Sequence, residues 1–107
     1  MIVEERNYLL VPGAADRYLD AWHRLGREPQ VRQLGDPLGV YRVEIGELNT
    51  LVYLWGYGDL ADRARRRGRL AVDADFAVFR AEVRGLLVTQ SNRILVSAVP
   101  PGGDSVP

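Results

Sequence analysis

Apolar and polar residues follow two different periods along the chain. Alternating runs rich in β-branched and aromatic residues predict strands, and apolar residues recurring every three to four positions predict helices. Strands are expected at Ile2–Val11, Gly39–Ile45, Thr50–Tyr57 and Val88–Val96. Helices are expected at Ala14–Leu25 and, as two segments separated near Asp73, at Leu60–Val72 and Ala74–Leu87.

The predicted boundaries rest on turn and capping residues. Pro12-Gly13 ends the first strand, and Gly26 is expected to end the first helix. Residues 27–37 are expected to form a loop with a short helical turn, since Gly35, Asp36 and Pro37 are breakers. Residues 46–49 suit a four-residue hairpin connection, and Asp59 suits the N-cap of the helix that begins at Leu60.

The order β-α-β-β-α-β predicts an α+β, ferredoxin-like subunit with both helices on one face of a four-stranded sheet. Residues 1–97 are expected to form this single domain. Residues 98–107, rich in proline and glycine, are expected to be a flexible C-terminal tail.

The third strand is apolar on both faces. Leu51, Tyr53, Trp55 and Tyr57 share one face, whereas Val52 and Leu54 share the other. Helices cover only one face of such a sheet, and a large exposed apolar face is unusual for a soluble monomer. The pattern therefore predicts a homodimer formed sheet to sheet.

Composition excludes several kinds of chemistry. Among 107 residues, 14 acidic side chains balance 14 basic ones, all of which are arginine, and there is no cysteine and one histidine. Thiolate and lysine chemistry are thus excluded, and we expect neither a metal site nor a cofactor. With no net charge and no apolar run of about 18 residues, we expect no nucleic-acid partner and no membrane span. Because Glu4, Glu5 and Arg6 interrupt the N-terminal apolar stretch, we expect a cytoplasmic protein.

Charged residues alternate along two predicted strands. Glu4, Arg6 and Tyr8 share one face of the first strand, and Arg42 and Glu44 share one face of the second. This pattern predicts a buried network in which Glu4, Arg6 and Glu44 lie close together. Such a network either binds an oxygenated substrate through residues that include Arg6, Tyr8 and Glu44, or is a purely structural ion-pair network.

Aromatic residues are the other candidates for a site. Tyr53, Trp55 and Tyr57 are either a wall for a planar ligand or simply core. On the first helix, Tyr18 and Trp22 would face the sheet. We therefore expect any small-molecule site to lie between this helix and the sheet.

Two residues are candidate proton carriers, and each has a structural alternative. His23 is a candidate general base, because histidine is the side chain whose unperturbed pKa lies near neutrality. The alternative is that His23 is a partly exposed surface residue. Tyr53 is the second candidate catalytic residue, and its alternative role is that of a core side chain without catalytic function. The run of arginines from Arg63 to Arg69 is expected to be a solvated helix face, because Asp59 and Asp62 precede Arg63 and Arg66 by four residues.

Four segments of the chain resemble the NIPSNAP family over about residues 2–96. They are Glu4-x-Arg6-x-Tyr8-x-Leu10-x-Pro12-Gly13, Glu44-Ile45-Gly46-x-Leu48-Asn49, Val52-Tyr53-Leu54-Trp55-x-Tyr57-x-x-Leu60-x-x-Arg63 and Gln90-x-x-Arg93-Ile94-Leu95. The resemblance implies a dimeric α/β barrel built of ferredoxin-like subunits. The sequence departs from the family pattern at Tyr53, where relatives commonly carry histidine, at Asp73-Ala74-Asp75-Phe76, and at Glu5.

The resemblance implies a fold more directly than a function. The wider superfamily contains cofactor-independent monooxygenases, isomerases, polyketide cyclases and some haem enzymes, and a shared fold transfers none of these activities. One hypothesis is a small cofactor-independent enzyme or binding protein for a hydrophobic, oxygenated metabolite, in natural-product biosynthesis. The alternative is a noncatalytic dimeric module that binds a protein partner.

Overall fold

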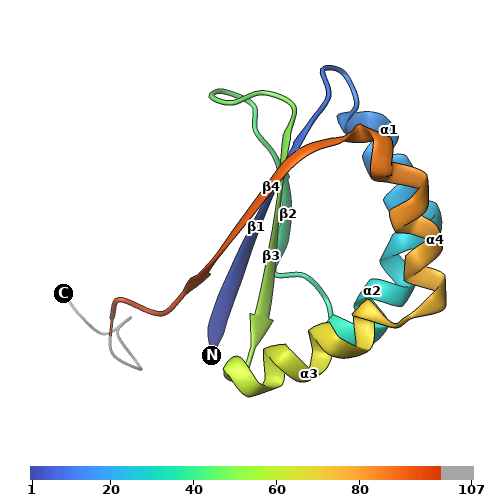
Figure 1. Cartoon of the computed structure of the whole chain (residues 1–107). Helices are drawn as coiled ribbons and strands as arrows, with labels where there is room; N and C mark the ends of the chain where they lie inside the picture. Colours follow the sequence, from blue (N-terminus) through green and yellow to red (C-terminus); the bar gives the residue numbers. More distant parts are fainter. Residues whose placement is uncertain (100–107) are drawn as a thin grey trace.

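Four strands form one sheet, and helices cover one of its faces (Figure 1). The computed structural model describes residues 1–99. Its strands are β1 (Ile2–Leu10), β2 (Gly39–Arg42), β3 (Thr50–Tyr57) and β4 (Leu87–Leu95). They lie in the order β2-β3-β1-β4, and every neighbouring pair is antiparallel. The predicted ferredoxin-like topology is confirmed, whereas the predicted tail lies outside the described residues from position 100 onward.

The helical layer forms an arc on one side of the sheet (Figure 1). Its elements are α1 (Ala15–Ala21), the π turn η1 (Trp22–Gly26), α2 (Arg27–Leu34), α3 (Leu60–Ala71), α4 (Ala74–Val83) and the 3₁₀ turn η2 (Arg84–Leu86). The Asp59 side chain accepts a hydrogen bond from the Asp62 backbone N–H, which confirms it as the cap of α3. Asp73 caps α4 in the same way, which explains the predicted break between the two helices.

The first helical region is longer than predicted. Gly26 does not end it, because the chain continues through η1 into α2 and ends at Leu34. Gly26 instead allows close packing, since a Cβ atom there would lie 2.8 Å from the Phe79 ring and 2.9 Å from the Trp22 ring. The breakers that begin at Gly35, with φ of +82°, mark the end of this region.

Strand β2 is shorter than predicted. It ends at Arg42 and not at Ile45, so residues 43–49 connect it to β3. Ile45 is 93% exposed and has no layer to pack against. Gly46 and Asn49 both adopt positive φ angles in this connection, which ends the extended backbone.

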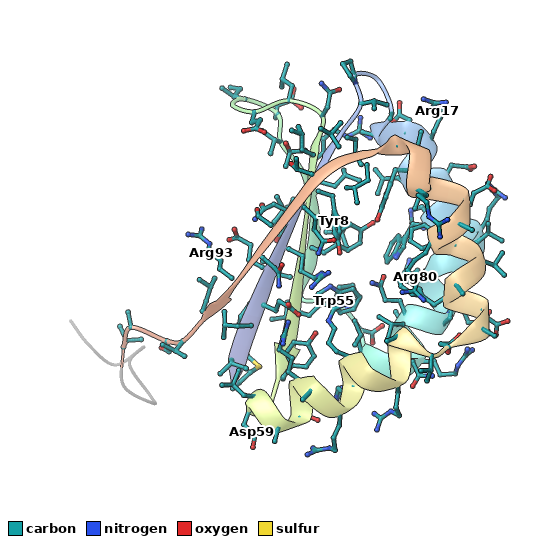
Figure 2. All side chains as sticks on the ribbon, in the orientation of Figure 1. Tyr8, Arg17, Trp55, Asp59, Arg80 and Arg93 are labelled. Atoms are coloured by element: carbon teal, nitrogen blue, oxygen red, sulfur yellow. The ribbon has the colours of Figure 1, made fainter. Side chains whose placement is uncertain are left out.

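Alternation along the central strands separates the core from the open face of the sheet. Leu51, Tyr53, Trp55 and Tyr57 are buried beneath the helices, whereas Val52 and Leu54 on the other face are half-buried. All nine residues of β4, which lies at one edge of the sheet, are exposed. Figure 2 shows Tyr8 and Trp55 projecting toward the helices and Arg93 lying on the opposite side of the sheet.

The two helical glycines Gly26 and Gly68 lead to a stability prediction. We expect Gly26→Ala to lower the free energy of unfolding by about 1–3 kcal/mol, because the new methyl group overpacks against Phe79 and Trp22. No atom lies within 4 Å of a Cβ at Gly68 in α3, so Gly68→Ala should raise the free energy of unfolding by about 0.5–1 kcal/mol. Urea unfolding of both variants checks this, and equal effects would contradict the proposed packing role of Gly26.

Candidate active site beneath the helices

One buried carboxylate receives five hydrogen bonds. Glu4, on β1, is fully buried. Its two oxygens accept from Arg6 Nη1 at 3.0 Å, Arg63 Nη2 at 2.7 Å, Arg67 Nε at 3.2 Å, the Tyr57 hydroxyl at 3.0 Å and Asn92 Nδ2 at 3.1 Å. We call these six residues the Glu4 cluster.

The Glu4 cluster forms because two parts of the fold meet on the helix-facing side of β1. Antiparallel pairing places Glu4 opposite Trp55 of β3 and Ile94 of β4. The hydrogen-bond partners Tyr57 and Asn92 are each two residues from these positions, on the same face of the sheet. Arg63 and Arg67 are four residues apart on α3, and this spacing places both on one face of the helix. The cluster therefore ties α3 to the sheet.

The three arginines keep Glu4 ionised. Burial by itself raises the pKa of Glu4, but the hydrogen bond from Arg63 and the charges of Arg67 and Arg6 outweigh it and lower the pKa to about 2. One negative charge thus faces three positive charges. The Glu4 cluster carries a net charge of +2, and none of its arginines can lose its proton near neutral pH.

A cavity of about 590 Å³ adjoins the Glu4 cluster, between α3 and α4 on one side and β1 and β4 on the other. This volume lies in the range of small-molecule sites. Its apolar lining is Tyr18, Phe76, Ala77, Phe79, Val83, Leu87 and Val88. Its polar lining includes Arg6, Tyr8, Gln30, Arg67, Arg80 and Arg84. Exposed residues of β4 and α4 border the cavity, so it opens to solvent there.

Hydrogen bonds hold several of the polar groups in place. Arg6 Nε donates to the Tyr8 hydroxyl at 2.8 Å, and Arg6 also contacts Glu4, so one side chain joins the cavity to the cluster. The buried Gln30 amide oxygen accepts from Trp22 Nε1 at 2.7 Å. Burial raises the pKa of Tyr18, with Tyr8 adding to the effect and Arg6 opposing it. Tyr18 is therefore a neutral hydroxyl near neutral pH.

The structure brings together some of the predicted site residues and separates others. Arg6, Tyr8 and Tyr18 line the cavity. Trp22, Tyr53, Trp55 and Tyr57 are buried but do not line it. Trp22 instead contacts Tyr53 edge to face, and Tyr53 stacks on Trp55. The predicted closeness of Glu4 and Arg6 is confirmed by their ion pair at 3.0 Å.

Glu44 and His23 lie elsewhere. The expectation that Glu44 is buried beside Glu4 is wrong, because β2 ends before it and Glu44 lies exposed in the connection to β3. His23 is also exposed, with its ring 5.2 Å from that of Trp22, and it does not line the cavity. Burial raises the pKa of Tyr53, and its hydroxyl has no hydrogen-bond partner within residues 1–99.

The prediction that the arginines from Arg63 to Arg69 form a solvated helix face is wrong for two of them. Asp62 pairs with Arg66 at 3.0 Å as expected, but Arg63 reaches Glu4 and not Asp59, whose carboxylate caps the helix. Arg67 likewise turns inward. A signal was present in the sequence, since Arg63 and Arg67 precede the buried Leu70 by seven and three residues and so share its face.

The position of the cavity differs in part from the prediction. It does lie between helices and sheet, and Tyr18 of α1 contributes to it. However, α4 forms much of its wall through Phe76, Phe79 and Arg80, and the arginine-rich α3 supplies Arg67. The phenylalanines of α4 were not predicted as site residues because their spacing is that of an ordinary core face. Figure 2 shows Arg80 across from Tyr8.

The cavity offers positive charge and tyrosine hydroxyl groups. Arginines and tyrosines held by other side chains can stabilise negative charge on a ligand oxygen without reorganising. Within the described residues, the lining contains no histidine and no carboxylate. In residues 1–99 there is also no group of three or more histidine, cysteine, aspartate or glutamate side chains placed to hold a metal ion. No helix in that same range has the length and apolar character needed to cross a membrane.

Comparison with known proteins agrees with the ferredoxin-like α+β fold. The NIPSNAP family model matches residues 3–100. An Agrobacterium tumefaciens protein of known structure is 37% identical, with 92% of this chain and 94% of that chain covered and a TM-score of 0.88. An uncharacterized NIPSNAP-like domain protein from Burkholderia xenovorans is 41% identical, with coverages of 94% and 89% and a TM-score of 0.87. The chain belongs to the NIPSNAP family.

A more distant similarity concerns the fold alone. A putative antibiotic biosynthesis monooxygenase from Nitrosomonas europaea superposes with a TM-score of 0.66 at 14% identity, covering 92% of this chain and 99% of that one. The described part of the chain thus shares its fold with this protein. No curated protein matches the sequence.

The lowered pKa of Glu4 predicts a specific loss of stability in acid. Folding lowers the pKa of Glu4 from 4.5 to about 2. The ionised Glu4 therefore contributes fully to the free energy of unfolding above pH 4.5, and this contribution is lost as the pH falls toward 2. After allowance for solvent screening, we expect this loss to be about 2 kcal/mol or more. Urea unfolding between pH 2 and 7 should show a smaller pH dependence for Glu4→Gln than for the wild type.

The exposed loop residue Glu47 supplies the matched control. Glu47→Gln makes the same chemical change outside the Glu4 cluster and should leave the pH dependence as it is in the wild type. If both variants keep the wild-type pH dependence of the free energy of unfolding in acid, Glu4 does not cause that dependence and its assigned role is wrong.

Proposed function

We propose that this NIPSNAP protein binds a hydrophobic, oxygenated metabolite in the cavity between α4 and the sheet. The observation that carries the proposal is the cavity itself, in which an apolar wall containing Phe76 and Phe79 faces fixed polar groups of Arg6, Tyr8 and Arg67. Apolar surroundings with a few convergent polar groups are typical of small-molecule sites. A noncatalytic interaction module does not require such a cavity.

The chemistry that this site supports is stabilisation of an oxyanion. Arg6 and Arg67 supply positive charge, and Tyr18 supplies a neutral hydroxyl. A substrate that forms an enolate or related anion would be stabilised there, which suits a cofactor-independent enzyme of the monooxygenase, cyclase or isomerase type. A putative antibiotic biosynthesis monooxygenase has the same fold, so this class and a place in natural-product biosynthesis are the first to test, although the shared fold transfers no activity. Catalytic roles for His23 and Tyr53 stay predictions.

We further propose that the working form is a cytoplasmic homodimer. The sheet face away from the helices carries half-buried Val52 and Leu54, with exposed Tyr41 beside Val52 on β2. On β4 the exposed Leu95 lies on the same face, opposite Val3 of β1. A second copy meeting this face would bury it, forming the α/β barrel that the sequence predicts.

The cavity can be tested by blocking it. We expect Ala77→Trp, which adds bulk to the cavity lining, to weaken the binding of bicyclic aromatic probes about tenfold or more, equivalent to about 1.4 kcal/mol of lost contact. The probes are 2-naphthol and 2-naphthoate, measured by calorimetry and by NMR shifts at Thr89 and Gln90. Ala81→Trp is the control, because Ala81 is exposed on the same helix and does not line the cavity.

Binding that is equal in the two variants would place the ligand outside the cavity. If neither probe binds the wild type, the ligand-binding proposal fails and the noncatalytic interaction module becomes the better account.

The dimer is tested by changing the open face of the sheet. Light scattering at micromolar concentration should give about twice the chain mass for the wild type. Leu54→Arg places a charge on the open face and should shift the mass toward that of one chain. Val78→Arg, at an exposed position on α4, should stay dimeric. A monomeric wild type with an unchanged melting temperature on dilution would contradict the proposal.

A further inference from the structure

The cavity has an unbalanced charge. Its lining contains Arg6, Arg67, Arg80 and Arg84 and, within the described residues, no aspartate or glutamate. The whole chain has equal numbers of acidic and basic residues, so this imbalance is local. Glu4 is the nearby counter-ion, but it is fully buried and is shared by three arginines.

The Glu4 carboxylate is also fully occupied as a hydrogen-bond acceptor. An ionised carboxylate offers about four lone-pair sites, and Glu4 already accepts from five donors. Nη2 of Arg67 is buried and has no hydrogen-bond partner in the part of the chain that the structure describes. A buried guanidinium N–H group without an acceptor is costly, so an acceptor from outside the chain would be favourable here.

Apolar surface lies next to these donors. Phe76 and Phe79 lie with their ring centroids 5.4 Å apart on α4, and Tyr18 contacts Phe79 edge to face at 5.5 Å. Tyr8 stacks beside Tyr18 at 6.0 Å. Aromatic rings in these arrangements suit contact with a flat, apolar ligand. The guanidinium group of Arg80 lies over the Phe76 ring, 5.6 Å from its centroid.

We infer that the ligand of this cavity is an aromatic or similarly flat apolar carboxylate, whose charged group is held by Arg67 and Arg6 and whose ring packs against Phe76 and Phe79. This inference rests on the proposed function and narrows its substrate class from oxygenated metabolites to organic anions. A carboxylate matches the planar fork of a guanidinium group in shape and charge. The arginines Arg80 and Arg84 at the solvent side attract the same anion toward the cavity.

The test compares two probes that differ in charge. At pH 7, 2-naphthoate is an anion and 2-naphthol is neutral, while both carry the same ring system. We expect the wild-type protein to bind 2-naphthoate about tenfold or more tightly than 2-naphthol, because hydrogen bonds to charged groups are the stronger ones. Arg67→Gln should reduce the affinity for 2-naphthoate about tenfold and leave that for 2-naphthol within about twofold.

Arg69→Gln is the matched control. It removes one positive charge from the same helix, but Arg69 is exposed and does not line the cavity. It should therefore leave both affinities nearly unchanged. Arg80→Gln is the second test variant, since Arg80 lines the cavity but lies outside the Glu4 cluster, and its loss should weaken 2-naphthoate binding without disturbing Glu4.

The outcomes separate the two proposals. If the wild type binds 2-naphthol as tightly as 2-naphthoate, the inference about the anion is wrong and the apolar site stands. Equal losses of 2-naphthoate affinity in Arg67→Gln and Arg69→Gln would also contradict it, because the effect would then be one of overall charge. If neither probe binds, both proposals fail.

Discussion

The buried carboxylate of Glu4 is the constraint on which the site depends. An ionised group without water is stable only when it is paired and hydrogen-bonded, and three arginines, a tyrosine and an asparagine supply those partners here. They come from every strand except β2 and from α3. The same contacts that satisfy Glu4 therefore fix the position of α3 over the sheet and leave positive charge at the edge of the cavity.

The fold was largely predictable from the sequence because it depends on local periodicity. The buried face of β3 and the caps at Asp59 and Asp73 are set by alternation and by short-range hydrogen bonds. The extent of the helix beyond Gly26 was not, because a glycine that ends a helix and one that permits close packing against Phe79 look alike in sequence. That difference is set by a residue more than fifty positions away.

The site was predictable only where its residues share one strand. Arg6 and Tyr8 alternate with Glu4, so their common face could be read directly. Arg63 and Arg67 join them through the packing of α3 on the sheet, and for Arg63 an exposed ion pair with Asp59 was an equally reasonable expectation. Glu44 illustrates the opposite error, because β2 ends once it has no layer to pack against.

The π turn at residues 22–26 keeps the two halves of the first helical region in phase although the region holds one residue more than a regular helix would. Tyr18 and Gln30 are twelve positions apart, so in an unbroken α-helix their side chains would point about 120° apart. The backbone N–H of Arg27 bonds to the Trp22 carbonyl, which adds one residue to this turn and reduces the difference to about 20°. Both side chains thereby reach the cavity. The turn thus holds one residue more than a regular helix of the same phase, and removing that residue would restore a regular α-helix in which the two positions, then eleven apart, still point about 20° apart.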